Sequence, residues 1–129
     1  RNDIEIPVGS CHGDMTLTNI IFCENGFYLI DFLDSFIESP LIDMAKIRQD
    51  TYFGWHRLFN NHRYDAIKNK ISCEYLDNAL SSFFNKFSFY QRHYSFFQIL
   101  NLCRIYPYDK NGRVRDKIDY WIKDILNNA

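Results

Sequence analysis

The spacing of hydrophobic residues changes near residue 40, and this change limits the folds open to the chain. Before residue 40, short apolar runs alternate with polar turns, which is typical of strands. After it, apolar residues recur every three or four positions, as they do on one face of a helix. We therefore expect a small β element followed by helices.

The first part of the chain predicts a β-hairpin. Three runs have the pattern of strands: 4–8, 19–23 and 27–32. The last two are joined through Asn25-Gly26, and both of these residues tolerate the positive φ of a tight turn. The hairpin is expected over about 20–31.

The rest of the chain predicts a helical bundle. Five segments have the helical period: 41–58, 64–71, 75–87, 91–106 and 114–125. Pro40 lies in or before the first turn of the first helix, where proline is well tolerated. The segment 91–106 is apolar on more than one side, so we expect it in the middle of the bundle, with the aromatic residues of 83–97 in the core. The fold class is α+β, mainly α.

Composition places the chain among globular proteins. Its 129 residues are 47% hydrophobic and 18% aromatic, which fits a single domain over 1–129 and excludes a disordered chain. The net charge of -1 argues against nucleic acid as a partner, because phosphate binding needs a basic surplus. Without an apolar run of about 20 residues or a signal peptide, we expect no membrane partner and a cytoplasmic location.

The cysteines agree with a reducing compartment. Cys11, Cys23, Cys73 and Cys103 are widely spaced and form no CxxC pair, so a zinc site is not expected. Two disulfides remain an alternative, but reduced and mostly buried thiols are favoured.

Polar residues with metal and acid–base chemistry gather around the hairpin. Asp14, Asn19, Asp31 and Asp34 come from one loop and from the end of the following strand. Two carboxylates and a carboxamide suit Mg²⁺, which prefers oxygen ligands. A further carboxylate kept clear of the metal could accept a proton from an attacking hydroxyl.

Three motifs resemble those of a known family. His12-Gly13-Asp14-Met15-Thr16-Leu17-Thr18-Asn19 resembles the HGDxxxxN catalytic loop of the aminoglycoside phosphotransferase and choline kinase group. Leu29-Ile30-Asp31-Phe32 resembles its metal-binding IDF or IDW strand end. Ser39-Pro40-Leu41-Ile42-Asp43-Met44-Ala45-Lys46 resembles its GDPxxDLA stretch. The motifs span residues 12–46 and imply the C-terminal lobe of a protein-kinase-like fold.

The resemblance also implies roles for individual residues. Asp14 matches the catalytic aspartate that deprotonates the acceptor hydroxyl, and Asn19 and Asp31 match the residues that bind Mg²⁺ and the ATP phosphates. His12 is expected to brace the loop, and Asp43 to cap or brace it from the following helix. Asp34 either approaches a second metal or the substrate, or forms a turn.

The implied function is ATP- and Mg²⁺-dependent phosphotransfer to a hydroxyl of a small molecule, namely a sugar, an amino alcohol or an aminoglycoside. One alternative is a catalytically inactive kinase-like binding domain. Another is a metal-dependent hydrolase that uses Asp31, Asp34 and Glu38. Six residues are candidates to line the acceptor pocket, although a solvated helix face or a core position explains them equally well: Gln49, Asp50, Tyr52, Trp55, Tyr106 and Tyr108.

Kinases of this group also have an N-terminal lobe with a strand lysine that grips the nucleotide. Only thirteen residues precede Asp14, and the five glycines form no phosphate-binding loop. We therefore expect this chain to be a C-terminal lobe whose N-terminal nucleotide lobe is absent, and to be inactive alone. An apolar face left uncovered near the hairpin would favour self-association.

Overall fold

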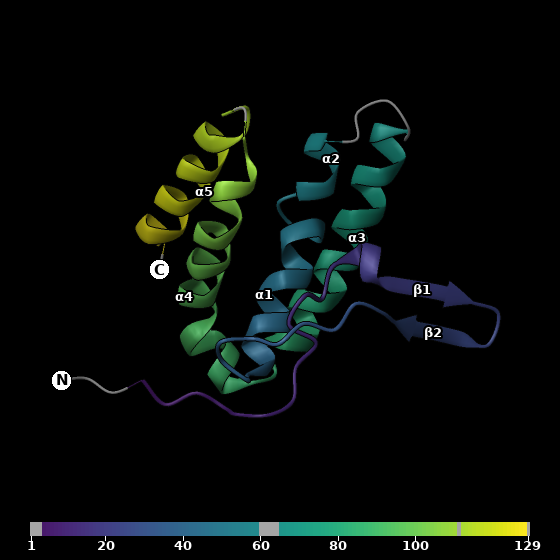
Figure 1. Ribbon diagram of the computed structural model, residues 1–129, viewed down its shortest axis with the longest axis horizontal. Coiled ribbons are helices and arrows are strands. Elements are labelled where there is room, and N and C mark those ends of the chain that lie inside the picture. The colour runs from purple at the N-terminus through teal and green to yellow at the C-terminus, as the bar shows by residue number, and fades with distance from the viewer. Residues whose placement is uncertain (1–3, 60–64, 111, 129) are drawn as a thin grey trace.

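A computed structural model describes residues 4–59, 65–110 and 112–128 (Figure 1). It confirms the α+β, mainly helical fold class, with one two-stranded antiparallel hairpin. The elements are η1 (Leu17–Asn19), β1 (Ile20–Cys23), β2 (Gly26–Leu29), α1 (Pro40–Thr51), α2 (Trp55–Phe59), α3 (Ala66–Phe84), α4 (Ser88–Ile105), η2 (Tyr106–Tyr108) and α5 (Arg115–Asn128).

The predicted hairpin is confirmed, but its turn lies one residue earlier than expected. Cys23 pairs with Gly26, so Glu24 and Asn25 form the turn. Gly26 takes the positive φ, +142°, whereas Asn25 does not. The hairpin extends away from the helices (Figure 1), and most of its side chains are exposed on both faces.

The strand predicted at 4–8 is wrong. These residues form no regular element, and within the described chain β1 and β2 pair only with each other. Val8 is 79% exposed, and a run without a partner strand cannot satisfy its backbone hydrogen bonds as a strand does.

Two of the predicted helix boundaries are also wrong. The helix expected over 41–58 is broken at Gly54, whose φ is +66° and whose amide donates to Asp50 O at 3.1 Å. A left-handed residue with this bond ends a helix, and α2 begins directly after it. Conversely, the segments expected at 64–71 and 75–87 are one helix, α3, since no Gly or Pro interrupts it. Residue 64 lies outside the described residues.

The last two predicted helices are confirmed with shifted ends. Asp109 explains where α5 starts, because its carboxylate accepts hydrogen bonds from the amides of Arg113, Val114 and Arg115 at 2.9–3.1 Å. Capping of this kind satisfies the free N–H groups of a helix start.

Helix α4 lies in the middle of the bundle, as predicted, between α1 and α5 (Figure 1). Leu41 and Phe97 are central in a core shared by α1, α3 and α4, while Leu102 and Ile118 join α4 to α5. Among the aromatic residues of 83–97, three are buried: Phe84, Tyr90 and Phe97. Phe83 and Phe96 are half exposed, so that prediction is right only in part.

All four cysteines are free thiols. Only Cys73 is buried, so the prediction of mostly buried thiols is wrong. In the part of the chain that the structure describes, no helix is both long and apolar enough to cross a membrane.

Candidate functional site

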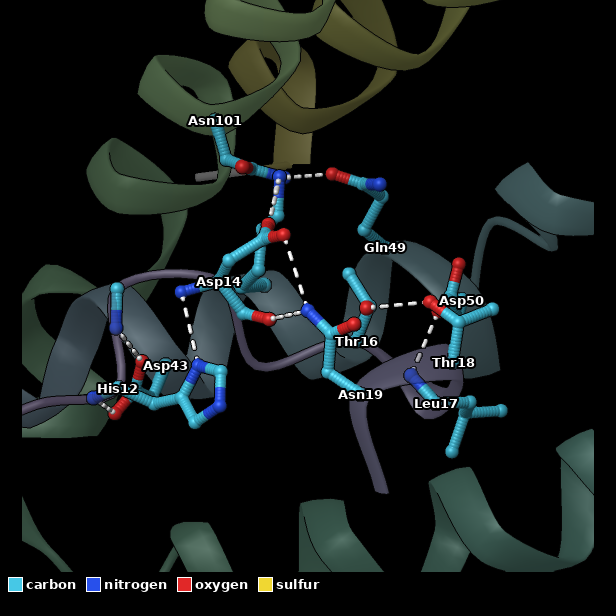
Figure 2. A network of polar contacts seen from close by, with 12 residues as sticks. His12, Asp14, Thr16, Leu17, Thr18, Asn19, Asp43, Gln49, Asp50 and Asn101 are labelled. Carbon is cyan, nitrogen blue, oxygen red and sulfur yellow. Dashed lines mark hydrogen bonds and ion pairs between the residues drawn. The ribbon is translucent and has the colours of Figure 1, made fainter. Parts of the chain in front are cut away.

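Helix α1 is the platform on which the site is built. It starts at Pro40, and Ser39 caps it by accepting a hydrogen bond from the Leu41 amide at 3.4 Å. Asp43, Lys46 and Asp50 follow at intervals of three and four residues, which places them on one face of the helix. This face meets the loop of residues 12–19, called here the 12–19 loop (Figure 2).

The 12–19 loop is held at both ends by carboxylates of α1. Asp43 accepts hydrogen bonds from the amides of His12, at 2.6 Å, and Gly13, at 2.9 Å. Asp50 accepts from the amide of Leu17 at 2.9 Å. Backbone groups that no strand or helix satisfies are thereby paired, which fixes the loop against the helix.

His12 links the loop to the chain that leaves the hairpin. Its side chain is buried, its Nε2 donates to Ile30 O at 2.7 Å, and its Nδ1 accepts from the Asp14 amide at 3.2 Å. These partners assign the ring proton to Nε2. The ring also lies 4.3 Å from that of Phe32, centroid to centroid. His12 therefore makes the contacts of a structural brace.

Gly13 occupies a position that only glycine fits. Its φ is +80°, and a Cβ atom there would lie 2.1 Å from the carbonyl oxygen of Leu33. The close approach of backbone to backbone brings the 12–19 loop against residues 30–33.

Asp14 is the carboxylate that the loop presents to solvent. Asn19 Nδ2 donates to its Oδ2 at 3.1 Å and to its backbone oxygen at 2.9 Å. Lys46 Nζ lies 3.1 Å from its Oδ1, in an ion pair where the Asp14 side chain is 28% exposed and that of Lys46 13%. The carboxylate is therefore oriented from two sides while one edge stays open.

Sequence reasoning assigned no role to Lys46. The available signal was its spacing, because a residue three positions after Asp43 must share its helix face.

The resemblance assigns a divalent cation to Asn19, which is buried, and Asp31, which is exposed. Asn19 directs its amide nitrogen at Asp14, so its Oδ1 points to the other side, and its backbone oxygen accepts from the Ile30 amide at 3.1 Å. Asp31 comes directly after Ile30 in the sequence. It is exposed and has a φ of +59°, a strained value for a residue with a side chain. Their side chains carry oxygen donors, the type that Mg²⁺ prefers, and Mg²⁺ usually takes few protein ligands and completes its shell with phosphates and water.

The structure does not gather the three residues of the hydrolase hypothesis, Asp31, Asp34 and Glu38, into one metal-binding group. Within residues 4–59, 65–110 and 112–128, no group of three or more His, Cys, Asp or Glu side chains could hold a metal ion. Asp34 and Glu38 line a small pocket of about 280 Å³, whose lining does not include Asp31.

A cleft of about 580 Å³, called here the Asp14 cleft, opens beside Asp14. Its described lining comprises Asp14, Thr16, Thr18, Leu33, Lys46, Gln49, Asp50, Trp55, His56, Phe59, Arg104, Ile105 and Tyr108. Four of the six candidate pocket residues are among them. Of the other two, Tyr52 lines a separate groove and Tyr106 packs on the core next to α5.

Asp50 is the buried charge of the cleft. Its side chain is only 2% exposed, and this burial raises the pKa of the carboxyl. The Leu17 amide and His56, whose Nδ1 lies 3.6 Å from Asp50 Oδ1, act in the opposite direction. His56 is held in turn by Asn69 Oδ1, 3.2 Å from its Nε2.

No family model, curated protein or solved structure matches the chain at a significant level.

Proposed function

We propose that this chain is the C-terminal lobe of an ATP- and Mg²⁺-dependent phosphotransferase with a protein-kinase-like fold, acting on the hydroxyl of a small molecule. The observation that carries the proposal is the setting of Asp14. Its carboxylate stands at a cleft large enough for a small acceptor, with Asn19 and Lys46 holding its two oxygens. The order of the motifs over residues 12–46 supports the same function.

In this mechanism Asp14 orients the acceptor hydroxyl and takes its proton. The hydroxyl oxygen forms a bond to the γ-phosphorus, the bond from that phosphorus to the β–γ bridging oxygen breaks, and ADP leaves with the electron pair. Mg²⁺, when bound, offsets the charge of the phosphates, and Asn19 and Asp31 would hold it. Lys46 keeps the Asp14 carboxylate in place and puts a positive charge beside the reacting oxygens.

The exposed apolar surface supports a second, nucleotide-binding lobe. Large apolar side chains of the hairpin and of the segment after it are 37–73% exposed. They are Ile21, Phe22, Phe27, Tyr28, Ile30, Phe32, Leu33 and Phe36. Exposed apolar surface of this extent is typical of an interaction site, and a two-stranded hairpin needs packing to be stable. We propose that the nucleotide lobe covers it. ATP as the donor, together with the free thiols, supports a cytoplasmic location.

A catalytically inactive binding domain is the second candidate. One observation favours it: both oxygens of the Asp14 carboxylate already have partners, Asn19 and Lys46, before any acceptor is bound. In such a domain this ion pair would persist and nucleotide would bind without turnover.

ADP release by the full-length protein, measured across a panel of hydroxyl acceptors, tests the proposal. Asp14→Asn is expected to lower kcat about 10²- to 10⁴-fold, the usual contribution of a general base, with an unchanged melting temperature. Asp119→Asn, the same change at an exposed position of α5, is the control and should leave kcat unchanged. An unaltered kcat in Asp14→Asn would contradict the assigned role, and nucleotide binding without turnover would favour the second candidate.

A further inference from the structure

The charges that line the Asp14 cleft offer no free carboxylate to a cationic acceptor. Asp14 is paired with Lys46 at 3.1 Å. Asp50 is buried between the Leu17 amide and His56. Arg104 adds a further cation to the wall of the cleft, where its guanidinium lies 5.2 Å from the ring of Phe36. An amine entering here would meet the cations Lys46 and Arg104, and both carboxylates already have partners, so ion pairing with the cleft would offset little of the cost of removing water from the amine.

The neutral polar groups of the cleft match hydroxyl groups. Gln49 is 2% exposed, and its Oε1 accepts from Asn101 Nδ2 at 2.9 Å (Figure 2). This bond fixes the orientation of the amide and leaves Nε2 as a donor, which has no hydrogen bond to the described residues. The hydroxyls of Thr16 and Thr18, 2.9 Å apart, add groups that donate and accept.

Three aromatic residues also line the cleft. Trp55 and Phe59 of α2 are packed edge to face with centroids 4.9 Å apart, and Tyr108 of η2 is 75% exposed. Rings of this kind provide flat apolar surface for the C–H face of a sugar. A volume of about 580 Å³ is within the range of small-molecule sites.

We infer that the acceptor bound in the Asp14 cleft is an uncharged sugar or polyol, which binds there in preference to amino alcohols and aminoglycosides. This inference rests on the proposed function, because it takes the Asp14 cleft as the acceptor site. Gln49 and the two threonines bind its hydroxyls, and the three aromatic residues bind its ring.

Binding to the full-length protein, measured by saturation-transfer NMR and calorimetry without ATP, tests the inference. The probes are matched pairs that differ in one amino group: glucose and glucosamine, galactose and galactosamine, with myo-inositol, choline and kanamycin. At least one neutral member is expected to bind about tenfold more tightly than its amine, which corresponds to about one hydrogen bond that the hydroxyl makes and the ammonium does not. Tighter binding of any amine, or no binding of any neutral probe at millimolar concentration, overturns the inference.

Gln49→Glu sharpens the test, because it replaces the amide donor of the cleft with a carboxylate. It should move the preference toward the amine by about tenfold, while Gln91→Glu, the same change on the exposed face of α4, should leave it unchanged. A shift in neither or in both variants speaks against the inference. Since the wild-type panel is read without catalysis, and Asp14→Asn should keep the neutral preference, failure of phosphotransfer and failure of sugar binding give different results.

Discussion

Helix α1 carries two polar networks that differ in their surroundings. The loop network consists of Asp43, Lys46 and Asp50 with their partners in the 12–19 loop, and Figure 2 shows the contacts of Asp43 and Asp50. The bundle network consists of Arg48 and Thr51 of α1, Asp77 of α3 and Tyr90 of α4. Each network follows the helical repeat along its own side of α1.

The bundle network is closed and buried. Arg48 donates to both oxygens of Asp77, at 2.9 and 2.8 Å, and to the hydroxyl of Tyr90 at 2.9 Å, while Thr51 donates to Asp77 at 2.7 Å. Burial alone would lower the pKa of Arg48, but the hydrogen bond to Asp77 and the charge interactions with Tyr94 and Tyr90 outweigh it, and the pKa is raised. A fully paired buried network of this kind holds three helices in one arrangement.

The loop network is open to the Asp14 cleft, and its carboxylates are directed at backbone amides of the 12–19 loop, at Lys46 and, for Asp50, at His56 of α2. The difference teaches that one helix can stabilise the bundle with one side and position the 12–19 loop with the other. Substitutions in the bundle network should reduce stability, and those in the loop network should affect the loop and its chemistry more than the whole fold.

The largest loss of stability is expected from Asp77→Ala. It leaves the Arg48 guanidinium buried without its carboxylate, which costs about 3–5 kcal/mol. Denaturant unfolding measures this free energy. Glu74→Gln is the control, since its pair with Lys70 is more than half exposed and is worth about 1 kcal/mol or less. If both variants lowered the free energy of unfolding equally, the buried Arg48–Asp77 pair would contribute no more than the exposed Lys70–Glu74 pair.

Gly13→Ala is expected to cost about 2–3 kcal/mol, from the left-handed φ and the contact with Leu33 O. Gly9→Ala is the matched control, because a Cβ there meets nothing within 4 Å. Thermal unfolding of both variants compares them. A harmless Gly13→Ala would show that the loop does not need this close approach.

Asp43→Asn should have a smaller and more local effect. Asparagine keeps one acceptor oxygen, so one of the amides of His12 and Gly13 loses its partner, at a cost of about 1–2 kcal/mol. Hydrogen exchange of these two amides should accelerate about 10-fold while that of α4 stays the same. If hydrogen exchange accelerated equally in all the helices, Asp43 would stabilise the whole fold, as the residues of the bundle network do.

The pH dependence of stability tests the burial of Asp50. Its pKa is raised in the folded state, so the folded chain binds a proton more readily than the unfolded chain. The stability that this proton contributes is present at low pH and is lost as the pH rises from about 3.8, the ordinary value, through the folded pKa. Asp50→Asn should lack this loss, as urea unfolding across the acid range would show. If the unfolding free energy of the wild type and of Asp50→Asn changed equally with pH, the burial of Asp50 would not be the cause of the loss.

The smallest effect on stability is expected on the hairpin. Phe22 and Phe27 pair across the strands and are 73% and 62% exposed, so Phe22→Ser should change the unfolding free energy by about 0.5 kcal/mol or less. It should, however, weaken self-association of the chain in sedimentation velocity. Leu126→Ser, at an exposed site of α5, is the control. If Phe22→Ser associated with itself as strongly as the wild type, Phe22 would not lie in the contact between copies of the chain.

Sequence patterns predicted the features that depend on neighbouring residues. The hairpin followed from apolar runs around Asn25-Gly26, and the helices from their period. The patterns failed at two places in particular, one decided by a distant partner and one by a local backbone conformation. Residues 4–8 have the composition of a strand but no partner to pair with, and the break at Gly54 depends on a left-handed cap that a helical pattern does not reveal.

The sequence by itself therefore determined the local elements and the order of the polar residues that suggest phosphotransfer. Only the tertiary structure decided which of those residues meet. The packing of α1 against the 12–19 loop pairs Lys46 with Asp14 and buries Asp50 beside Leu17. The physical reason is that periodicity acts over one or two helical turns, whereas ion pairing and desolvation depend on how separate segments cross.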